Sequence, residues 1–408
     1  MKILIHGLNF SPEMIGIGKY TGELAQWLAA AGNDVHVVTA PPYYPDWKVQ
    51  SPYKAWRYRT ENWSGVIVVR CPLWVPSKVS GLTRILHLLS FAISSHFAMV
   101  SQAKFKPDVV ISIVPTLFAA SSAARIARRA KAVSWLHIQD FELDAAANLG
   151  ILHSKKSLMS MAIRWEKSVL NRFDRMSSIS NQMVKRLIEK GIPAEKTTLF
   201  PNWVDTNVIH PIHSEPNAYR TKLGISEDQV MILYSGNMGA KQGLNLIVDA
   251  ARNLQEYPQL VFVLCGNGSS RSELEKSAGG LLNLKFLDLQ PPHQLNLLLN
   301  SADIHILPQQ AGAADVVMPS KLLGMLASGK PVIATALEGT ELADVVSQVG
   351  IVVPPNDVDA AARAILKLAN SPELRQNLGD KSLELVSRKW GQDNVLSDFL
   401  IALRTLIS

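Results

Sequence analysis

A hydroxyl and an ammonium group meet at the start of one helical pattern in the second half of the chain. Ser320 and Lys321 follow Pro319, and the apolar pattern of the helix runs to Ala327. A helix N-terminus presents free N–H groups and the positive end of its dipole, so all these groups could serve one anion. We expect Ser320 to bind this anion and Lys321 to bind it and act in catalysis. An ordinary helix start with a solvated lysine is the alternative.

Two glycine-rich corners precede this helix in the same half, at 235–243 and 265–269, and each follows an apolar run typical of a strand. Open α/β sheets bind ligands outside the carboxyl ends of their strands, so the corners should converge. Lys241 places a cation where a diphosphate could bind. The residues expected to contact the ligand here are Gly236, Asn237, Lys241, Gly266 and Gly268.

The first half offers a weaker set of candidates. Gly16 and Gly18 lie between the first strand pattern and the first helix, where they would let a ligand approach the backbone, although such turns are also common without a ligand. His137 ends an apolar strand pattern and Asp140 follows it, so both are candidate catalytic residues; a structural histidine is the alternative. Cysteines and histidines show no metal-ligand spacing, and we expect neither a metal nor a cofactor.

Alternating strand and helix patterns must position these residues. The strands expected in the first half are 2–8, 35–39, 66–70, 108–113, 132–137 and 175–179, with a helix at 19–31 and an irregular excursion at 41–64. Those of the second half are 230–235, 260–265, 284–287, 304–307 and 331–335, alternating with helices at 243–254, 271–278, 292–300 and 321–327. This rhythm predicts an α/β protein with two doubly wound parallel sheets.

The chain of 408 residues suits two domains, which we place at 1–205 and 206–390, with a hinge near 202–217. Residues 391–408 contain an amphipathic helix. Two cysteines, Cys71 and Cys265, lie in or beside strand patterns and are expected to be buried thiols of a reducing compartment. The first residues lack the pattern of a signal peptide, so we expect a cytoplasmic protein.

Positive charge is concentrated in the first domain. Residues 1–205 hold 25 Lys and Arg against 14 Asp and Glu, a balance of +11, whereas the whole chain carries +7. No nucleic-acid motif accompanies this charge, which favours an anionic membrane surface or a lipid diphosphate as the partner. The apolar stretch 85–100, with 16 residues, is too short to span a bilayer. It predicts a helix lying in the membrane interface, with a buried domain helix as the alternative.

Several runs resemble glycosyltransferase family 4 over nearly the whole chain. They are 10–13 with Gly16 and Gly18, 200–205, 233–243 and 330–334, and a further likeness covers 40–45, 136–140 and 312–315. The resemblance implies the GT-B fold, with two Rossmann-like domains facing a central cleft and a C-terminal helix that crosses back to the first domain. It also implies that the second domain binds the nucleotide-sugar, that Asn202 takes part in binding, and that the first domain faces the acceptor and the membrane.

The activity implied by this resemblance is retaining transfer of a sugar from a GDP- or UDP-sugar donor. Fucose from GDP-fucose is the implied sugar, and a polyprenyl-diphosphate-linked saccharide at the inner membrane is the implied acceptor. The product would be an exopolysaccharide of the colanic-acid type. Two readings of the same architecture remain open, namely a sugar-nucleotide 2-epimerase and a non-catalytic nucleotide-sugar-binding subunit.

The sequence departs from the family pattern at two places. Many members have two glutamates eight residues apart, where this chain has Val316 and Gly324. The usual arginine and lysine of the diphosphate loop fall on Asn237 and Gln242, which leaves Lys241 one position away. We therefore assign the diphosphate to Lys321 and Lys241.

Overall fold

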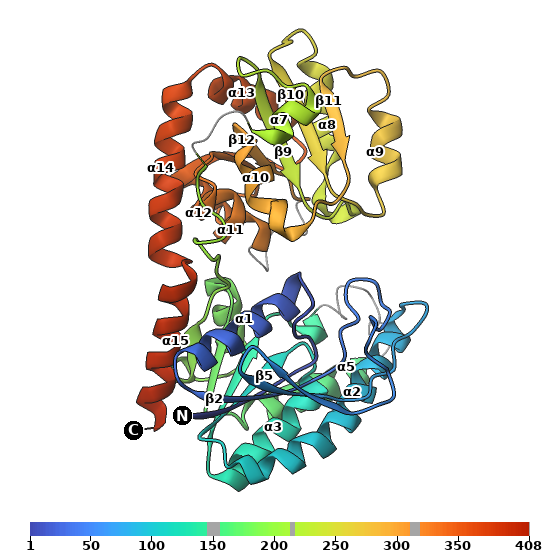
Figure 1. Cartoon of the computed structure of the whole chain (residues 1–408), viewed down its shortest axis with the longest axis vertical. Coiled ribbons are helices and arrows are strands. Elements are labelled where there is room, and N and C mark those ends of the chain that lie inside the picture. Colours follow the sequence, from blue (N-terminus) through green and yellow to red (C-terminus); the bar gives the residue numbers. More distant parts are fainter. Residues whose placement is uncertain (145–155, 213–216, 311–318, 408) are drawn as a thin grey trace. The chain divides into compact units, whose positions relative to one another are not determined.

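The chain forms two compact units in the computed structural model, which describes residues 1–144, 156–212, 217–310 and 319–407. Unit 1 contains Met1–Pro201 together with Leu396–Ser408, and unit 2 contains Asn202–Val395. Each unit is one sheet with helices on both faces (Figure 1). The two α/β sheets expected from the sequence are therefore confirmed.

The sheet of unit 1 has eight strands in the order β3-β4-β2-β1-β5-β6-β7-β8. Seven of them pair in parallel, as expected from the alternation of strands and helices. The strands are β1 (Lys2–Gly7), β2 (Asp34–Thr39), β3 (Arg59–Trp63), β4 (Val66–Arg70), β5 (Val109–Val114), β6 (Val133–Ile138), β7 (Arg175–Ser178) and β8 (Thr197–Leu199).

The edge strand β3 corrects the prediction that 41–64 is irregular throughout. It pairs antiparallel with β4 through a two-residue turn at Ser64 and Gly65, whose φ angles are 49° and 85°. Positive φ at both positions suits the twist of a hairpin. The turn also receives a side-chain contact, because Gly65 N donates to Asn62 Oδ1 at 3.0 Å.

Helices cover this sheet on both faces. They are α1 (Gly16–Ala30), α2 (Gly81–Gln102), α3 (Leu117–Ala130), α5 (Lys156–Leu170) and α6 (Asn181–Glu189), with short 3-10 turns η1 (Ala103–Phe105) and η2 (Ala194–Lys196). Helices α2 and α3 pack together over one sheet face (Figure 1). Leu4, Val110 and Phe91 belong to the core between them and the sheet. Helix α1 starts at Gly16, three residues before the predicted start, so both candidate glycines lie in its first turn.

Helix α2 is longer than the apolar stretch that predicted it. With η1 it covers Gly81–Phe105, and within the described residues this is the one helix whose length and composition would allow it to cross a membrane. A third of its apolar window (33%) is buried in the protein. One face of α2 therefore belongs to the core of unit 1.

Unit 2 has a six-stranded parallel sheet in the order β11-β10-β9-β12-β13-β14. The strands are β9 (Val230–Ser235), β10 (Leu260–Cys265), β11 (Leu284–Leu287), β12 (Ile304–Leu307), β13 (Val332–Thr335) and β14 (Gly350–Val353). The helices are α7 (Ala218–Leu223), α8 (Asn245–Asn253), α9 (Arg271–Ser277), α10 (Leu295–Asn300), α11 (Ser320–Ala327), α12 (Glu341–Val349), α13 (Val358–Ala369) and α14 (Pro372–Lys389), with η3 (Ala240–Gln242) and η4 (Pro292–Gln294).

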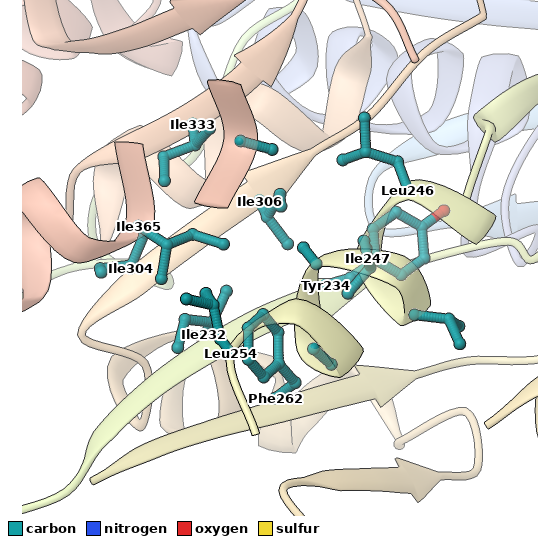
Figure 2. Packing of buried hydrophobic residues seen from close by; sticks show 14 of the residues in the cluster. Ile232, Tyr234, Leu246, Ile247, Leu254, Phe262, Ile304, Ile306, Ile333 and Ile365 are labelled. Carbon is teal, nitrogen blue, oxygen red and sulfur yellow. The ribbon is translucent and has the colours of Figure 1, made fainter. Parts of the chain in front are cut away.

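Alternate residues of each strand in unit 2 enter different cores. Ile232 and Tyr234 join the core with α8 and α13 that Figure 2 shows, whereas Met231 and Leu233 pack toward α7 and α10 on the other face. Because side chains of a strand alternate between faces, a sheet buried on both sides needs continuous apolar runs. The apolar run of β9 meets this need, and the strand ends at Ser235, directly before Gly236.

The last helix, α15 (Gln392–Ile407), joins unit 1 from Leu396 onward. Phe399 stacks on Phe200 with ring centroids 4.0 Å apart, and its ring meets Trp135 edge to face at 5.0 Å. Burying one such aromatic side chain stabilises a fold by about 2 kcal/mol. The expectation that the C-terminal helix returns to the first domain is confirmed.

Candidate active site

Two glycine corners of unit 2 touch through their backbones. Gly236 follows β9 and Gly266 follows β10, and Gly236 N donates to the carbonyl of Cys265 at 2.9 Å. A Cβ atom on Gly266 would lie 1.9 Å from the Gly236 carbonyl oxygen, and φ of Gly266 is 142°. No residue with a side chain fits there. The sequence prediction that these corners converge is therefore correct.

The residues that follow Gly236 and Gly266 continue the backbone contact between the two corners. Met238 N donates to the Asn267 carbonyl at 2.9 Å, and Ser270 N donates to the Met238 carbonyl at 2.9 Å. A Cβ on Gly268 would lie 2.4 Å from the same Met238 oxygen. The two loops thus form one rigid backbone surface at the carboxyl edge of the sheet, where parallel sheets bind ligands.

Arg271 braces the second corner, and sequence reasoning missed it. Its guanidinium donates to the Gly266 carbonyl at 2.8 Å and to Asn267 Oδ1 at 2.7 Å. Asp288 and Glu275 neutralise its charge at 2.6 and 2.8 Å. The arginine therefore holds the loop and is not a free cation for a ligand.

Lys321 lies against the first corner. Its Nζ donates to the Tyr234 hydroxyl at 2.8 Å and lies 4.4 Å from the centroid of that ring. A Cβ on Gly236 would be 3.1 Å from Nζ, so the glycine leaves room for the ammonium group. Burial lowers the pKa of Lys321 to about 8. Within the described part of the chain no carboxylate pairs with this lysine, which leaves its charge for a bound anion.

The Tyr234 hydroxyl links the lysine to the loop. It donates to the Asn237 carbonyl at 2.6 Å, so strand end, loop and ammonium form one connected network. Such a network holds donors in place before a ligand arrives.

Three other predicted ligands stand on the surface of unit 2. Ser320 is the first residue of α11, and its side chain is exposed; Asn237 and Lys241 are exposed as well. Gln242, which replaces the usual family lysine, accepts from Gly239 N at 3.1 Å through Oε1 and so closes the loop. The structure brings Lys321 to the glycine corners and leaves Lys241 in the short turn η3.

A pocket of about 200 Å³ in unit 1 contains two predicted residues, Gly16 and Asp140. Gly16 has φ of 63° as the first residue of α1. Three rings of this pocket form a cluster. The ring centroid of Tyr43 lies 5.6 Å from that of Trp47 and 4.8 Å from that of His87. Flat aromatic surfaces beside a few polar groups are typical of small-molecule sites. Sequence reasoning missed the cluster, because its members come from distant segments.

Gly18 serves packing within unit 1. A Cβ there would lie 2.5 Å from Glu13 Oε2, so the glycine makes space for this carboxylate. Glu13 accepts from the backbone N–H groups of Tyr43 and Tyr44 at 3.0 Å each and from Asn9 Nδ2 at 2.9 Å. Burial raises the pKa of Glu13. This buried carboxylate therefore holds the aromatic segment of the pocket in position.

His137 lies inside the fold of unit 1 and does not line that pocket. Its ring is 2% exposed, its Nδ1 pairs with Ser177 Oγ at 2.9 Å, and it lies 4.8 Å from the ring of Phe200. Burial lowers its pKa to about 3, so the imidazole is neutral at physiological pH. These contacts favour the structural reading that the sequence left open.

Glu142 is a better candidate than His137 for a group that exchanges a proton. Its Oε2 accepts from the N–H of Leu117 at the start of α3 at 2.9 Å, while Oε1 is shielded and has no partner among the described residues. Burial raises its pKa to about 7, and the neighbouring charge of Asp140 adds to the shift. A carboxyl group of this kind can exchange a proton near neutral pH.

Asn202 is the first residue of unit 2, and its Oδ1 is shielded without a partner in the described chain. The run 312–315 and Val316 lie outside the described residues. Within the described ranges, no group of three His, Cys, Asp or Glu could hold a metal ion.

Comparisons with known proteins agree with this geometry. Residues 16–203 match the family described as Glycosyl transferase 4-like domain, and residues 216–384 match Glycosyl transferases group 1. The chain is 41% identical over 99% of its length, and over 100% of the relative, to the "Putative colanic acid biosynthesis glycosyl transferase WcaI" of Escherichia coli (strain K12).

Solved structures share the fold at low sequence identity. A sucrose-phosphate synthase from Thermosynechococcus elongatus matches with a TM-score of 0.76 at 17% identity, covering 99% of this chain and 98% of that one. Anabaena Alr3699/HepE in complex with UDP matches with a TM-score of 0.71 at 15% identity, covering 99% and 100%.

Proposed function

Because the chain belongs to glycosyltransferase family 4 and is a glycosyltransferase of the GT-B fold, we propose that it transfers a sugar from a nucleotide-sugar to a lipid-linked acceptor, with retention of configuration. The observation that carries the donor assignment is the Lys321 ammonium group. It lies beside Gly236, within the described residues no carboxylate pairs with it, and Tyr234 holds it in place. This is a site for a diphosphate.

The chemical step requires stabilisation of the departing diphosphate. The bond between the anomeric carbon and the diphosphate oxygen breaks, the acceptor oxygen bonds to that carbon, and the hydroxyl proton leaves with the diphosphate. Tyr234 holds Lys321 in place before the reaction, so its ammonium group stabilises the developing charge at little reorganisation cost. Lys241 and Ser320 add an exposed cation and a hydroxyl at the same edge of unit 2.

The donor in this proposal is GDP-fucose, and the product is an exopolysaccharide of the colanic-acid type. Support for the pathway comes from the printed name of the 41% identical relative. A nucleotide-sugar donor in general is supported by UDP in a solved structure of the same fold. UDP-sugars are therefore the competing donors in the test below.

The membrane side of the proposal rests on the outer face of α2. Three apolar side chains of this face are more than 60% exposed, namely Leu82, Ile93 and Phe97. The face continues with Ile85, Leu86 and Val100, and the exposed cations Lys78, Arg84, Lys104 and Lys106 border the helix. An apolar stripe bordered by cations suits a helix that lies in the interface of an anionic bilayer.

The opposite face of α2 argues for lying on the bilayer instead of crossing it. Phe91 and Met99 are fully buried, and His87 Nδ1 pairs with the Trp74 carbonyl at 2.6 Å. A spanning helix would have to expose these groups to lipid. In this proposal the protein is cytoplasmic and lies peripherally on the inner face of the cytoplasmic membrane.

The decisive experiment follows labelled sugar from donor to lipid. The full chain is incubated with labelled GDP-fucose, or with UDP-glucose and UDP-galactose, and with vesicles containing a polyprenyl-diphosphate-linked glucose. Label should pass from GDP-fucose to the lipid phase and should not do so in the Lys321→Ala variant. An altered nucleotide-sugar with no lipid label would indicate an epimerase, and binding without any turnover would indicate a non-catalytic subunit.

A further inference from the structure

A second pocket of unit 1, about 380 Å³ in volume, is separate from the residues discussed so far. Its walls come from the segment before β3, from β3 itself and from the end of β4. Four of its lining residues are cations: Lys54, Arg57, Arg59 and Arg70. Pro41, Pro52, Tyr53 and Tyr58 complete the walls. A pocket of this volume can hold a small anionic group together with part of the ligand that carries this group.

Only one carboxylate within the described residues of this region balances these cations. Glu61 accepts from Arg70 Nε at 2.9 Å and pairs with Arg59 Nε at 3.2 Å. It also accepts from the Tyr53 hydroxyl at 3.2 Å, so its oxygens are occupied. The pocket therefore keeps a surplus of positive charge.

Two of the cations, the buried Arg70 and the exposed Arg59, are held by contacts within the pocket. Arg70 is 1% exposed and donates to the carbonyls of Ala40 and Ser11 at 3.2 and 2.5 Å. The guanidinium groups of Arg59 and Arg70 lie 5.0 and 5.1 Å from the ring centroid of Tyr53. Cation–π and hydrogen-bond contacts of this kind hold charge in place before a ligand binds.

Lys54 and Arg57, the remaining two cations, are exposed as well. Among the described residues neither has a carboxylate partner, and Lys54 Nζ lies 5.7 Å from the centroid of the exposed Trp56 ring. An ammonium and a guanidinium free to close on a ligand from the rim are typical of phosphate recognition.

The pocket adjoins the apolar face of α2. The Tyr58 hydroxyl donates to the Ser94 carbonyl of that helix at 2.9 Å. The neighbouring residue in the helix is Ile93, whose side chain is 64% exposed. A basic pocket beside an apolar helix face matches a molecule with a hydrocarbon chain and a phosphate head.

We propose that the pocket formed by Lys54, Arg57, Arg59 and Arg70 binds the diphosphate of a prenyl-type lipid, the acceptor of the proposed transfer. The inference rests on the proposed function only for the identity of the lipid. A diphosphate pocket in unit 1 also stands without it, because the charge surplus and the walls are features of the fold.

The test uses the double variant Lys54→Ala/Arg57→Ala of the full chain. Both side chains are exposed, so the fold should persist, which circular dichroism and the unfolding midpoint check. The matched control is Arg128→Ala/Arg129→Ala, two exposed cations of α3 that do not line the pocket and whose loss changes the net charge equally.

Binding is measured by calorimetry with inorganic pyrophosphate in the presence of saturating UDP, which occupies the diphosphate site at Lys321, and by flotation with vesicles of phosphatidylcholine containing farnesyl diphosphate. The Kd for pyrophosphate and the fraction bound to diphosphate vesicles should each worsen at least tenfold in the pocket variant and less than twofold in the control. The Kd for UDP and GDP should stay unchanged in both. Equal losses in the two variants, or a parallel loss of nucleotide binding, would overturn the proposal.

A vesicle of phosphatidylcholine and phosphatidylglycerol separates the diphosphate from a general anionic surface. If the pocket variant loses this binding as strongly as it loses farnesyl diphosphate, the cations serve surface attraction and the pocket proposal is wrong. Transfer assays separate the two proposals. If the pocket variant loses pyrophosphate binding but the unaltered protein transfers no sugar, only the proposed function is wrong. If the pocket variant transfers sugar with an unchanged acceptor KM, only the pocket proposal is wrong.

Discussion

At the scale of single residues, Lys321 has the environment of an anion ligand: a half-buried ammonium group held by Tyr234 without a paired carboxylate in the described chain. Lys321→Ala should lower kcat by about two orders of magnitude or more, because a preorganised donor at the leaving group is lost. The unfolding midpoint should change little. Lys276→Ala, an exposed lysine of α9, is the control and should keep full activity. Near-normal turnover of Lys321→Ala would remove this residue from the mechanism.

The pH dependence of nucleotide binding offers a second test of Lys321. Because burial lowers its pKa to about 8, the ammonium form that binds a diphosphate is present below this pH and is lost above it. Affinity for GDP or UDP should therefore fall as pH rises from 7 to 9.5. In Lys321→Arg the charge persists over this range, so the affinity, although weaker, should be flat. A parallel decline in both proteins would contradict the assignment.

Glu142 gives a stability prediction of known sign. Its folded pKa of about 7 lies above the ordinary glutamate value, so folding favours the protonated form. Its contribution to stability is full below about pH 4 and is lost as pH rises to 7. Glu142→Gln, which keeps an acceptor for Leu117 N, should raise the unfolding free energy at pH 8 by on the order of 1 kcal/mol, a value discounted for partial solvent access. Urea unfolding at pH 4 and 8 measures this, and a gain only at pH 4 would refute it.

At the scale of elements, the corners after β9 and β10 depend on direct backbone contact. Gly266→Ala would place a Cβ against the Gly236 carbonyl, so it should lower the unfolding free energy by about 3 kcal/mol and abolish nucleotide binding. Gly280→Ala is the matched control: φ is positive (86°), but no atom lies within 4 Å of the new Cβ. It should cost about 1 kcal/mol and leave binding intact. Equal effects of the two changes would mean that backbone contact is not decisive.

Helix α2 makes the second prediction at this scale. Ile93→Gln/Phe97→Gln replaces two strongly exposed apolar side chains by a good helix former, so stability should change by less than about 0.5 kcal/mol. Flotation with anionic vesicles should fall at least fivefold. Leu282→Gln/Leu289→Gln changes two apolar residues of unit 2 that are at least as exposed and should leave flotation unchanged. Equal flotation of both variants would argue against α2 as the membrane face.

At the scale of the whole molecule, two sheets with separate cores define two units that can respond to ligands separately. A nucleotide at 100 times its Kd should stabilise the protein by about 2.7 kcal/mol. Hydrogen exchange should show the added protection in peptides around Gly236 and Gly266. Peptides of β5 in unit 1 should change little. Protection confined to unit 1 would contradict the assignment of the nucleotide to unit 2.

Much of the fold was predictable because the signals are local. Continuous apolar runs such as that of β9 predict buried parallel strands, and glycines directly after them predict ligand corners. Strand β3 was missed, since its alternation is weak and only the turn at Ser64 and Gly65 marks it. His137 ends the predicted strand pattern as an active-site residue could, but its pairing with Ser177 depends on the strand next to it in the sheet.

The sequence alone determined the two α/β sheets, the family, the glycine corners and the lysine at the start of α11. These features are predictable because short local stretches of sequence mark where strands end and helices begin. Only the tertiary structure decided what these residues contact. It placed Glu13 against Gly18, and it closed a basic pocket from segments on both sides of β3. Such contacts join residues that are far apart in the chain, and a periodic pattern holds no information about which distant side chains will meet.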